Sequence, residues 1–354
     1  MKSKKKTNRR NAVTMADVAE RANVSLTTVS FVLSENSDVS ISDETKRRVH
    51  EASNELGYRR NAAARALASR RTSLLGIVSD VVFSPFGGEA IIGAQDEARS
   101  RGLQLLMSAY DEESLSNPYE PLLDRQVEAL AIMMTTHRSI EVPTELGSIP
   151  TVLVNCFDES GTIASITPDE QLAGRDATEY LISCGHERIG LINLEPDRVA
   201  AIGRRMGYEQ ALASAGLELD PRLIVEGDAD ARAGYADAKV LLGLEKPPTA
   251  IFCATDRKAM GAYDAIKETG LRIPEDISIM GFDDQQIITE YLRPPLTTMR
   301  LPFREMAQRA VEVLADKLAS DAAPLTSERI NCQLVKRESV GPPRDTRIEL
   351  APSV

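Results

Sequence analysis

The N-terminal segment encodes short helices with closely spaced start and stop signals, and this pattern constrains the fold more than any other. Residues 15–22 form an amphipathic pattern behind Thr14, whose hydroxyl can cap exposed amides, and Asp17 follows at the spacing of a capping box. Ser25 can cap a second helix that runs to about Ser34. The spacing therefore predicts two short helices joined by a tight turn.

A third helix completes this segment. Ser42 can cap a helix over residues 43–56, and Gly57 can end it in the left-handed conformation. Apolar residues at helical spacing suffice for a small core; they are Val18, Ala19, Val24, Val29, Val32, Val49, Ala52 and Leu56. The outward positions of the second helix are small or hydroxylated, which suits a helix that enters a DNA groove. The segment therefore predicts an all-α helix-turn-helix headpiece that binds DNA.

Charge is distributed unevenly along the 354-residue chain. Residues 1–71 contain 15 Lys and Arg against 8 Asp and Glu, whereas the remainder contains 27 against 45. A basic head on an acidic body indicates a nucleic-acid-binding module attached to a part that avoids nucleic acid. A solvated basic tail would explain residues 1–12, which we expect to be disordered, but not the helix-turn-helix behind them.

Features that are absent bear on location. The basic start is followed by an amphipathic helix pattern, which argues against a signal peptide, and no apolar run approaches the length of a membrane span. The cysteines show no metal or redox spacing; they are Cys156, Cys184, Cys253 and Cys332. We therefore expect reduced thiols in a cytoplasmic, nucleoid-associated protein with no cofactor and no metal site.

Beyond residue 72 the chain alternates short apolar runs with longer helical patterns. Strands are predicted over residues 74–79, 103–108, 129–134, 151–155, 163–166, 188–194, 223–226, 250–254 and 277–281. Helices are predicted over residues 88–101, 172–184, 204–215, 232–242 and 256–269. This alternation indicates an α/β fold with two lobes, each a doubly wound parallel sheet. A ligand is expected beyond the carboxyl ends of the strands, in a cleft between the lobes.

The chain resembles the LacI/GalR family of transcriptional regulators from Val13 to about Val340. The resemblance is carried by MADVAERANVSLTTVS, NAAARALAS, GHERIGLIN, GRRMGYEQAL, PTAIFCATDRKAMGAYDAIKETGLRIPEDISIMGFDD and LRPPLTTMR, in that order. It implies a DNA-binding headpiece, a hinge helix, and a sensor built like a periplasmic sugar-binding protein. It also implies a homodimer on an inverted-repeat operator, and the Pro-containing tail after Val340 lacks the heptads of a tetramerisation helix.

The domain boundaries follow from the same resemblance. We expect a headpiece at residues 13–60, a hinge helix and linker at 61–71, and an effector-binding and dimerisation domain at 72–354. The chain is expected to cross between the lobes near Thr167, Pro294–Thr298 and Pro324–Arg329. The first lobe would then hold residues 72–167 and 298–324, and the second lobe residues 168–294 and 325–340.

The DNA contacts implied by the resemblance lie mostly on the second helix. Leu26, Thr27 and Phe31 would face base edges, and Ser25, Thr28 and Ser30 would bond phosphates. Thr14, Tyr58 and Asn61 match further backbone-contacting positions. Phe31 stands where many members carry an arginine that grips guanine. Its ring could lie against a thymine methyl or could pack into the core of the head.

Residues 61–69 match the hinge helix, which in the family folds on the operator and enters the minor groove in pairs. Leu67 occupies the position of an apolar wedge between base pairs, and Ala64 supports the contact between the paired hinge helices. Without the resemblance, an ordinary flexible linker would be the better interpretation, because so short a helix is marginal alone in water.

Five residues are expected to bind the effector. Arg204 and Asp283 match the family arginine and carboxylate that take ligand hydroxyls, and Phe86 matches a stacking position. Thr255 stands where many family members have a side chain that faces the pocket, and Asp169 lies at the first crossing between lobes. We assign the neighbouring Asp256 mainly to capping the helix that it begins.

The effector class stays open at this point. A sugar that releases the operator, in a repressor of carbohydrate uptake or catabolism genes, is the main prediction. A purine, nucleoside or polyol acting as corepressor, or control by a protein partner, are the alternatives. An enzyme is disfavoured because no dinucleotide or phosphate-binding loop follows a strand and the three histidines stand apart; His186 is expected to fix a loop. An exported binding protein is also disfavoured, because such a protein does not need a DNA-binding headpiece.

Overall fold

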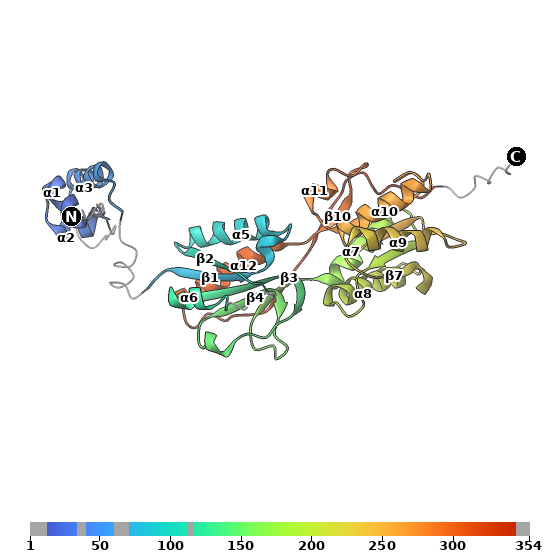
Figure 1. Ribbon diagram of the computed structural model, residues 1–354, viewed down its shortest axis with the longest axis horizontal. Coiled ribbons are helices and arrows are strands. Elements are labelled where there is room, and N and C mark those ends of the chain that lie inside the picture. Colours follow the sequence, from blue (N-terminus) through green and yellow to red (C-terminus); the bar gives the residue numbers. More distant parts are fainter. Residues whose placement is uncertain (1–12, 34–39, 60–70, 112–116, 345–354) are drawn as a thin grey trace, which may run out of the picture. The chain divides into compact units, whose positions relative to one another are not determined.

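The structure is a computed structural model, and it describes residues 13–33, 40–59, 71–111 and 117–344. The chain divides into two compact units, Met1–Thr72 and Ser73–Val354, which we describe separately. Figure 1 colours them along the sequence, with the three small helices of the first unit in blue. No helix in the described ranges is long and apolar enough to cross a membrane.

The first unit consists of α1 (Met15–Ala22), α2 (Leu26–Leu33) and α3 (Asp43–Leu56). Its capping box is confirmed, because the Thr14 hydroxyl accepts from the Asp17 amide at 3.4 Å and the Asp17 carboxylate accepts from the Thr14 amide at 2.7 Å. Ser42 caps α3 as predicted. Gly57 ends α3 with φ at 63°, in the left-handed region that favours glycine.

Seven buried side chains form the core of this unit, Val18, Ala19, Ala22, Val29, Val32, Val49 and Ala52. Six of them are among the residues predicted from helical spacing. The other two predicted residues, Val24 and Leu56, are partly buried and pack against the cluster. The headpiece therefore has its own core, drawn from all three helices.

The second unit holds two six-stranded sheets. The first sheet, in the order β11-β5-β4-β3-β1-β2, contains β1 (Leu74–Ser79), β2 (Gln104–Ala109), β3 (Ala129–Ser139), β4 (Thr151–Phe157), β5 (Ser165–Pro168) and β11 (Glu328–Ile330). The second sheet, in the order β12-β10-β9-β8-β6-β7, contains β6 (Ile189–Asn193), β7 (Ile224–Glu226), β8 (Ala250–Cys253), β9 (Ser278–Asp283), β10 (Thr297–Arg300) and β12 (Gln333–Val335). All pairs are parallel except β10 with β12. We call the parts built on these sheets the N-lobe and the C-lobe.

Helices connect the strands as parallel pairing requires. The N-lobe carries α5 (Gly87–Ser100), α6 (Glu120–Asp124), α12 (Phe303–Ala319) and the short 3-10 turns η1 (Val81–Phe83) and η2 (Thr144–Leu146). The C-lobe carries α7 (Glu170–Ser183), α8 (Val199–Ser214), α9 (Ala231–Leu242), α10 (Asp256–Glu268), α11 (Gln286–Thr289) and η3 (Pro221–Leu223). The predicted α/β class with two parallel sheets is confirmed.

The strand pairing corrects two of the three predicted crossing points. Thr297–Arg300 pairs with β9, so the chain leaves the C-lobe only after Arg300 and not near Pro294–Thr298. Glu328–Ile330 pairs with β5, so the chain returns to the C-lobe only after Ile330. Residues 297–300 therefore belong to the C-lobe and residues 325–330 to the N-lobe. These strands have three or four residues, too few for a periodic pattern.

Two glycines set the close packing of helix pairs in the C-lobe. A Cβ atom on Gly207 of α8 would lie 2.1 Å from the carbonyl oxygen of Gln171 on α7. A Cβ on Gly261 of α10 would lie 1.9 Å from the carbonyl oxygen of Ala231 on α9. Only glycine allows backbones to approach this closely, so these helix pairs are fixed by the absence of a side chain.

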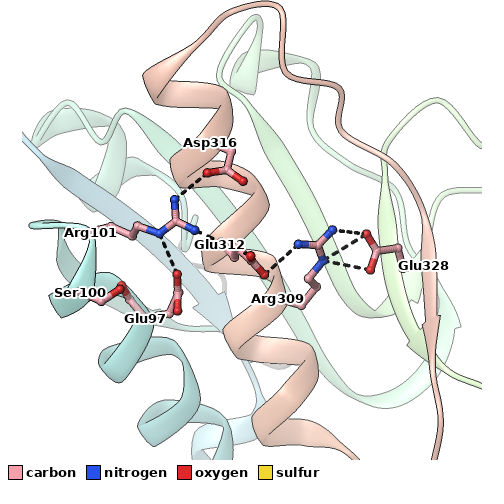
Figure 2. Close-up of polar contacts among 7 residues, drawn as sticks. All are labelled: Glu97, Ser100, Arg101, Arg309, Glu312, Asp316 and Glu328. Atoms are coloured by element: carbon pink, nitrogen blue, oxygen red, sulfur yellow. Dashed lines mark hydrogen bonds and ion pairs between the residues drawn. The ribbon is translucent and has the colours of Figure 1, made fainter.

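A chain of ion pairs joins α5, α12 and β11 on the N-lobe (Figure 2). Arg101 donates to Glu97 at 2.8 Å and to Asp316 at 2.6 Å. Arg309 forms a two-pronged contact with Glu328, the shortest distance being 2.6 Å, and also donates to Glu312 at 2.8 Å. These contacts tie β11 to α12, the helix that precedes this strand in the chain.

Candidate functional site

A cavity of about 420 Å³ lies between the two lobes of the second unit. It is lined by Asp80, Ser84, Pro85, Phe86, Thr135, Thr136, His137 and Asn155 of the N-lobe, by Glu170, Leu194, Arg198, Ala200, Arg204, Ala229, Thr255, Arg257, Asp283 and Gln285 of the C-lobe, and by Leu301 of the second crossing segment. Most of these residues follow the carboxyl ends of parallel strands, where α/β sheets bind ligands. Four of the five predicted effector residues line it.

Arg204 is held rigidly in the wall of this cavity. Its Nε donates to Glu170 at 2.8 Å, its Nη1 donates to the carbonyl oxygen of Ala254, and its guanidinium carbon lies 3.5 Å from the ring centroid of Phe282. Burial alone would lower the pKa of Arg204, but Glu170 and Asp283 raise it above its ordinary value. The guanidinium is therefore a fixed cation whose direction is set before a ligand arrives.

Glu170 is a site residue that sequence analysis missed. Its side chain is 5% exposed, and its second carboxylate oxygen lies 3.7 Å from Nδ1 of His137 in the N-lobe. Burial alone would raise the pKa of Glu170, but Arg204 and His137 hold it below its ordinary value. The carboxylate thus neutralises Arg204 and reaches across to the opposite lobe.

Asp169, the predicted residue next to it, does not reach this cavity. Its carboxylate accepts from the amide of Leu172 at 3.0 Å and caps α7. Asp169 instead lines a neighbouring cavity of about 620 Å³, which shares only His137 and Glu170 with the first. Side chains of consecutive residues at the start of a helix point in different directions. The geometry of α7 therefore decides that Glu170 lines the cavity and Asp169 does not.

Asp283 lines the cavity, and Asp256 is buried behind it. Asp283 accepts from Gln285 Nε2 at 3.0 Å, and burial raises its pKa to about 7 although Arg204 acts in the opposite direction. Asp256 accepts from the Gln285 amide and from Thr298 Oγ1, both at 2.7 Å. Burial and the nearby Asp283 raise the pKa of Asp256 well above its ordinary value.

The assignment of Asp256 as a helix cap is therefore wrong. Thr255 caps α10, because its hydroxyl accepts from the Lys258 amide at 3.1 Å. Asp256 is fully buried and joins α10 to the loop after β9 and to β10. Its hydrogen-bond partners lie 29 and 42 residues away in the chain, so no local sequence pattern predicts them.

Phe86 supplies an aromatic face on the N-lobe side. Its ring stacks on Phe303 of α12 with centroids 4.7 Å apart and planes inclined by 18°. The C-lobe wall has only aliphatic or small side chains at the corresponding apolar positions, Leu194, Ala200 and Ala229. Within the described lining, Phe86 supplies the only phenyl ring, and the His137 imidazole is a second, polar ring on the same lobe.

Hydrogen-bond acceptors gather on the N-lobe wall. Asp80 receives the amide and the hydroxyl of Thr135 at 2.7 and 3.0 Å. Asn155 has φ of 55°, is 1% exposed, and donates to the carbonyl oxygens of Met134 and Thr135. Its Oδ1 is buried without a hydrogen-bond partner in the described structure. A buried acceptor of this kind is expected to receive a donor from a ligand.

The remaining predicted positions lie in the headpiece. Thr14, Ser25, Leu26 and Thr27 are exposed, and Thr28, Ser30, Phe31 and Tyr58 are half-buried. The Ser25 and Thr28 hydroxyls lie 2.8 Å apart, and Ser25 accepts from the Thr28 amide, so this hydroxyl pair also starts α2. Asn61, Ala64 and Leu67 lie outside the described residues.

One secondary prediction can be checked directly. His186 fixes a loop as expected, because its ring nitrogens bond Thr249, Ser278 and the carbonyl oxygen of Gly341 at 2.9–3.1 Å. The cysteines are free; Cys156, Cys253 and Cys332 are buried. Within the described residues, no group of three or more His, Cys, Asp or Glu side chains could hold a metal ion.

Comparisons with known proteins agree with this architecture. Residues 14–61 match the family of bacterial regulatory proteins of the lacI type, and residues 178–340 match the periplasmic binding protein-like domain. The ribose operon repressor of Haemophilus influenzae is 34% identical over 92% of this chain and 98% of its own length. The HTH-type transcriptional repressor PurR of Aliivibrio salmonicida is 32% identical over the same shares.

Among solved structures, the lac repressor dimer bound to operator and the anti-inducer ONPF superposes with a TM-score of 0.75 and 28% identity, over 93% of this chain and 99% of that one. The match extends over the headpiece as well as the two-lobed unit. The chain therefore belongs to the LacI family of DNA-binding transcriptional regulators.

Proposed function

We propose that this regulator represses genes of carbohydrate uptake or catabolism, and that a sugar in the interlobe cavity releases it from its operator. The observation that supports a sugar most directly is the composition of the cavity wall. The lining combines acceptors from both lobes, Asp80, Asn155 and Asp283, with the phenyl ring of Phe86. Sugars present hydroxyl donors on their edges and C–H surface on their faces, which suits this arrangement.

A purine corepressor is the second candidate, because PurR of Aliivibrio salmonicida is almost as similar as the ribose operon repressor. A planar base gains most from stacking on both faces. The C-lobe lining has no aromatic ring to pair with Phe86, since its apolar residues are Leu194, Ala200 and Ala229, and this favours the sugar. The similarity to the ribose operon repressor of Haemophilus influenzae points the same way.

DNA would be bound by two headpieces in a homodimer. On α2, Leu26, Thr27 and Phe31 are assigned to base edges, and Ser25, Thr28 and Ser30 to phosphates, with Thr14, Tyr58 and Asn61 as further backbone contacts. Ala64 and Leu67 are assigned to the hinge pair in the minor groove. The headpiece is taken as residues 13–60, the hinge as 61–71 and the sensor as 72–354.

Large apolar side chains remain exposed on both lobes of the single chain. Val82 and Ile92 of the N-lobe are each 43% exposed, and Ile287 and Tyr291, on and just after α11, are 77% and 73% exposed. An apolar side chain this exposed gains stability when a partner surface covers it. We assign them to the homodimer. The same chain would act in the cytoplasm, where its DNA is.

Selection of bound fragments from a random duplex library tests the DNA assignment, and thermal-shift screening against sugars, polyols and purines tests the effector, because a ligand of the folded state raises the melting temperature. We expect an inverted repeat, and at least one sugar that both raises the melting temperature and lowers operator affinity. Leu67→Ala should weaken specific binding far more than random-duplex binding. A purine that tightened operator binding would replace the sugar hypothesis.

A further inference from the structure

Two arginines of the C-lobe line the interlobe cavity. Arg198 ends the loop between β6 and α8, and Arg257 lies in the first turn of α10, after β8. Strands β6 and β8 are parallel neighbours in the C-lobe sheet, so the segments that follow them emerge side by side at its carboxyl edge. Both side chains line the cavity. We call this pair the cationic corner.

The positive charge of this corner is only partly neutralised by the protein. Arg204, deeper in the cavity, is neutralised by Glu170 at 2.8 Å. Arg198 pairs with Glu195 at 2.7 Å. Arg257 is exposed and makes no hydrogen bond or ion pair with any residue that the structure describes. Burial raises the pKa of Asp283 and Arg257 acts on that carboxyl through space in the opposite direction, but no direct contact within the described residues neutralises the charge of Arg257.

The helix starts add to this positive potential. Both arginines lie at the N-terminal ends of long helices, where the backbone dipole already disfavours a cation. The start of α8 has no capping side chain and no acidic residue in its first turn, and Ala200 from that turn lines the cavity. A negatively charged group placed here would meet two guanidinium groups and free backbone amides, which is the arrangement that anions prefer.

The N-lobe wall of the same cavity suits hydroxyl groups and not an anion. Asn155 of the N-lobe lines the cavity, is 1% exposed and has an unpartnered Oδ1, which can accept from a hydroxyl. Asp80 of the same lobe offers a further acceptor. The lining therefore combines acceptors for hydroxyls on the N-lobe with two arginines on the C-lobe.

We propose that the effector is an anionic sugar, a monosaccharide that carries a phosphate or carboxylate, with this group bound by Arg257 and Arg198 and its hydroxyls bound on the Asn155 wall. This proposal rests on the proposed sugar-responsive function and narrows it to charged sugars. Neutral sugars would fill the hydroxyl wall and leave the cationic corner to water.

Calorimetric titration of the full chain against matched sets tests the proposal: ribose with ribose 5-phosphate, and glucose with glucose 6-phosphate and glucuronate. In at least one set, the anionic member should bind about 100-fold more tightly than its neutral parent. Arg257→Gln should weaken that binding about 10- to 100-fold, as expected for one charge-assisted hydrogen bond, and should leave the neutral parent unaffected. Arg272→Gln, which removes an exposed arginine paired with Asp276 elsewhere on the C-lobe, is the control. The phosphate and carboxylate arms identify the anion.

Inorganic phosphate is a second probe, independent of the sugar part. It should raise the melting temperature of the wild-type chain at low salt, and Arg257→Gln should reduce that shift where Arg272→Gln does not. A neutral sugar that binds as tightly as its charged relatives and releases the operator would overturn this inference while leaving the proposed function intact. If no sugar of either kind bound, both would be overturned.

Discussion

The buried pair of Glu170 and Arg204 allows the most direct test of how the cavity is built. Glu170→Gln keeps the shape of the side chain and removes its charge, so the Arg204 guanidinium would remain buried with no full counter-charge. The side chains of the two residues are 5% and 4% exposed. Breaking a buried ion pair from one side costs about 3–5 kcal/mol, because the remaining charge stays desolvated. We expect a loss of that size in the free energy of unfolding.

The assay is urea denaturation of the full chain, followed by a signal from the two-lobed unit. Glu179→Gln is the matched control on the same helix, since Glu179 pairs with Arg175 at 3.5 Å and is 50% exposed. An exposed pair contributes about 0–1 kcal/mol, so the control should change little. If Glu170→Gln lowered the free energy of unfolding by less than about 1 kcal/mol, the reasoning that each partner neutralises a desolvated charge on the other would be refuted.

The pH dependence gives a second readout of the same pair. The pKa of Glu170 lies below its ordinary value of 4.5, so its ionised form stabilises the folded state above that pH. The contribution is lost as the pH falls through the lower, folded-state value. The difference between the wild type and Glu170→Gln should therefore be full at neutral pH and shrink below about pH 4.5. A double variant, Glu170→Leu with Arg204→Met, should recover stability and lose effector binding.

Three further predictions concern single sites. The pKa of Asp283 is raised to about 7 from an ordinary 3.8, so the wild type should lose stability as the pH rises between these values. Asp283→Asn should flatten this pH dependence in urea titrations. Parallel curves of stability against pH for the two proteins would exclude this. Gly207→Ala should destabilise the C-lobe by about 1–3 kcal/mol or more, because its Cβ would lie 2.1 Å from the Gln171 carbonyl oxygen, whereas Gly88→Ala, with open space around it, should be tolerated. Ser42→Ala should cost the headpiece about 1 kcal/mol in thermal unfolding by removing the cap of α3, and an unchanged melting temperature would show that the cap is dispensable.

Local chemistry explains which parts of the fold could be predicted. The starts and ends of the headpiece helices depend on hydrogen bonds between residues three or four apart, such as Ser42 with Thr45, and on the backbone freedom of Gly57. The strand β1 and the helix α3 have the predicted bounds, because their patterns are long and bordered by clear signals. The order of the α/β elements follows from the same patterns.

The candidate site was predictable only in part. Arg204, Asp283, Phe86 and Thr255 line one cavity, but the resemblance to a family singled them out and not their local patterns. Lys258 is a residue whose buried position could not be predicted from the sequence. It is fully buried, donates to the carbonyl oxygens of Gly227 and Asp228, and pairs with Asp237 at 2.9 Å. Nothing near it in the sequence distinguishes it from a solvated lysine on the surface of a helix.

The amino-acid sequence by itself determined the headpiece and the two-sheet architecture, because these depend on periodicity and on bonds between near neighbours. Only the tertiary structure decided that Glu170 and not Asp169 faces the cavity, that Asp256 joins distant segments, and where the chain crosses between lobes. Each of these depends on contacts across tens to more than a hundred residues, such as Glu170 with Arg204 and β5 with β11. Such contacts are chosen by how whole elements pack, and no single segment encodes them.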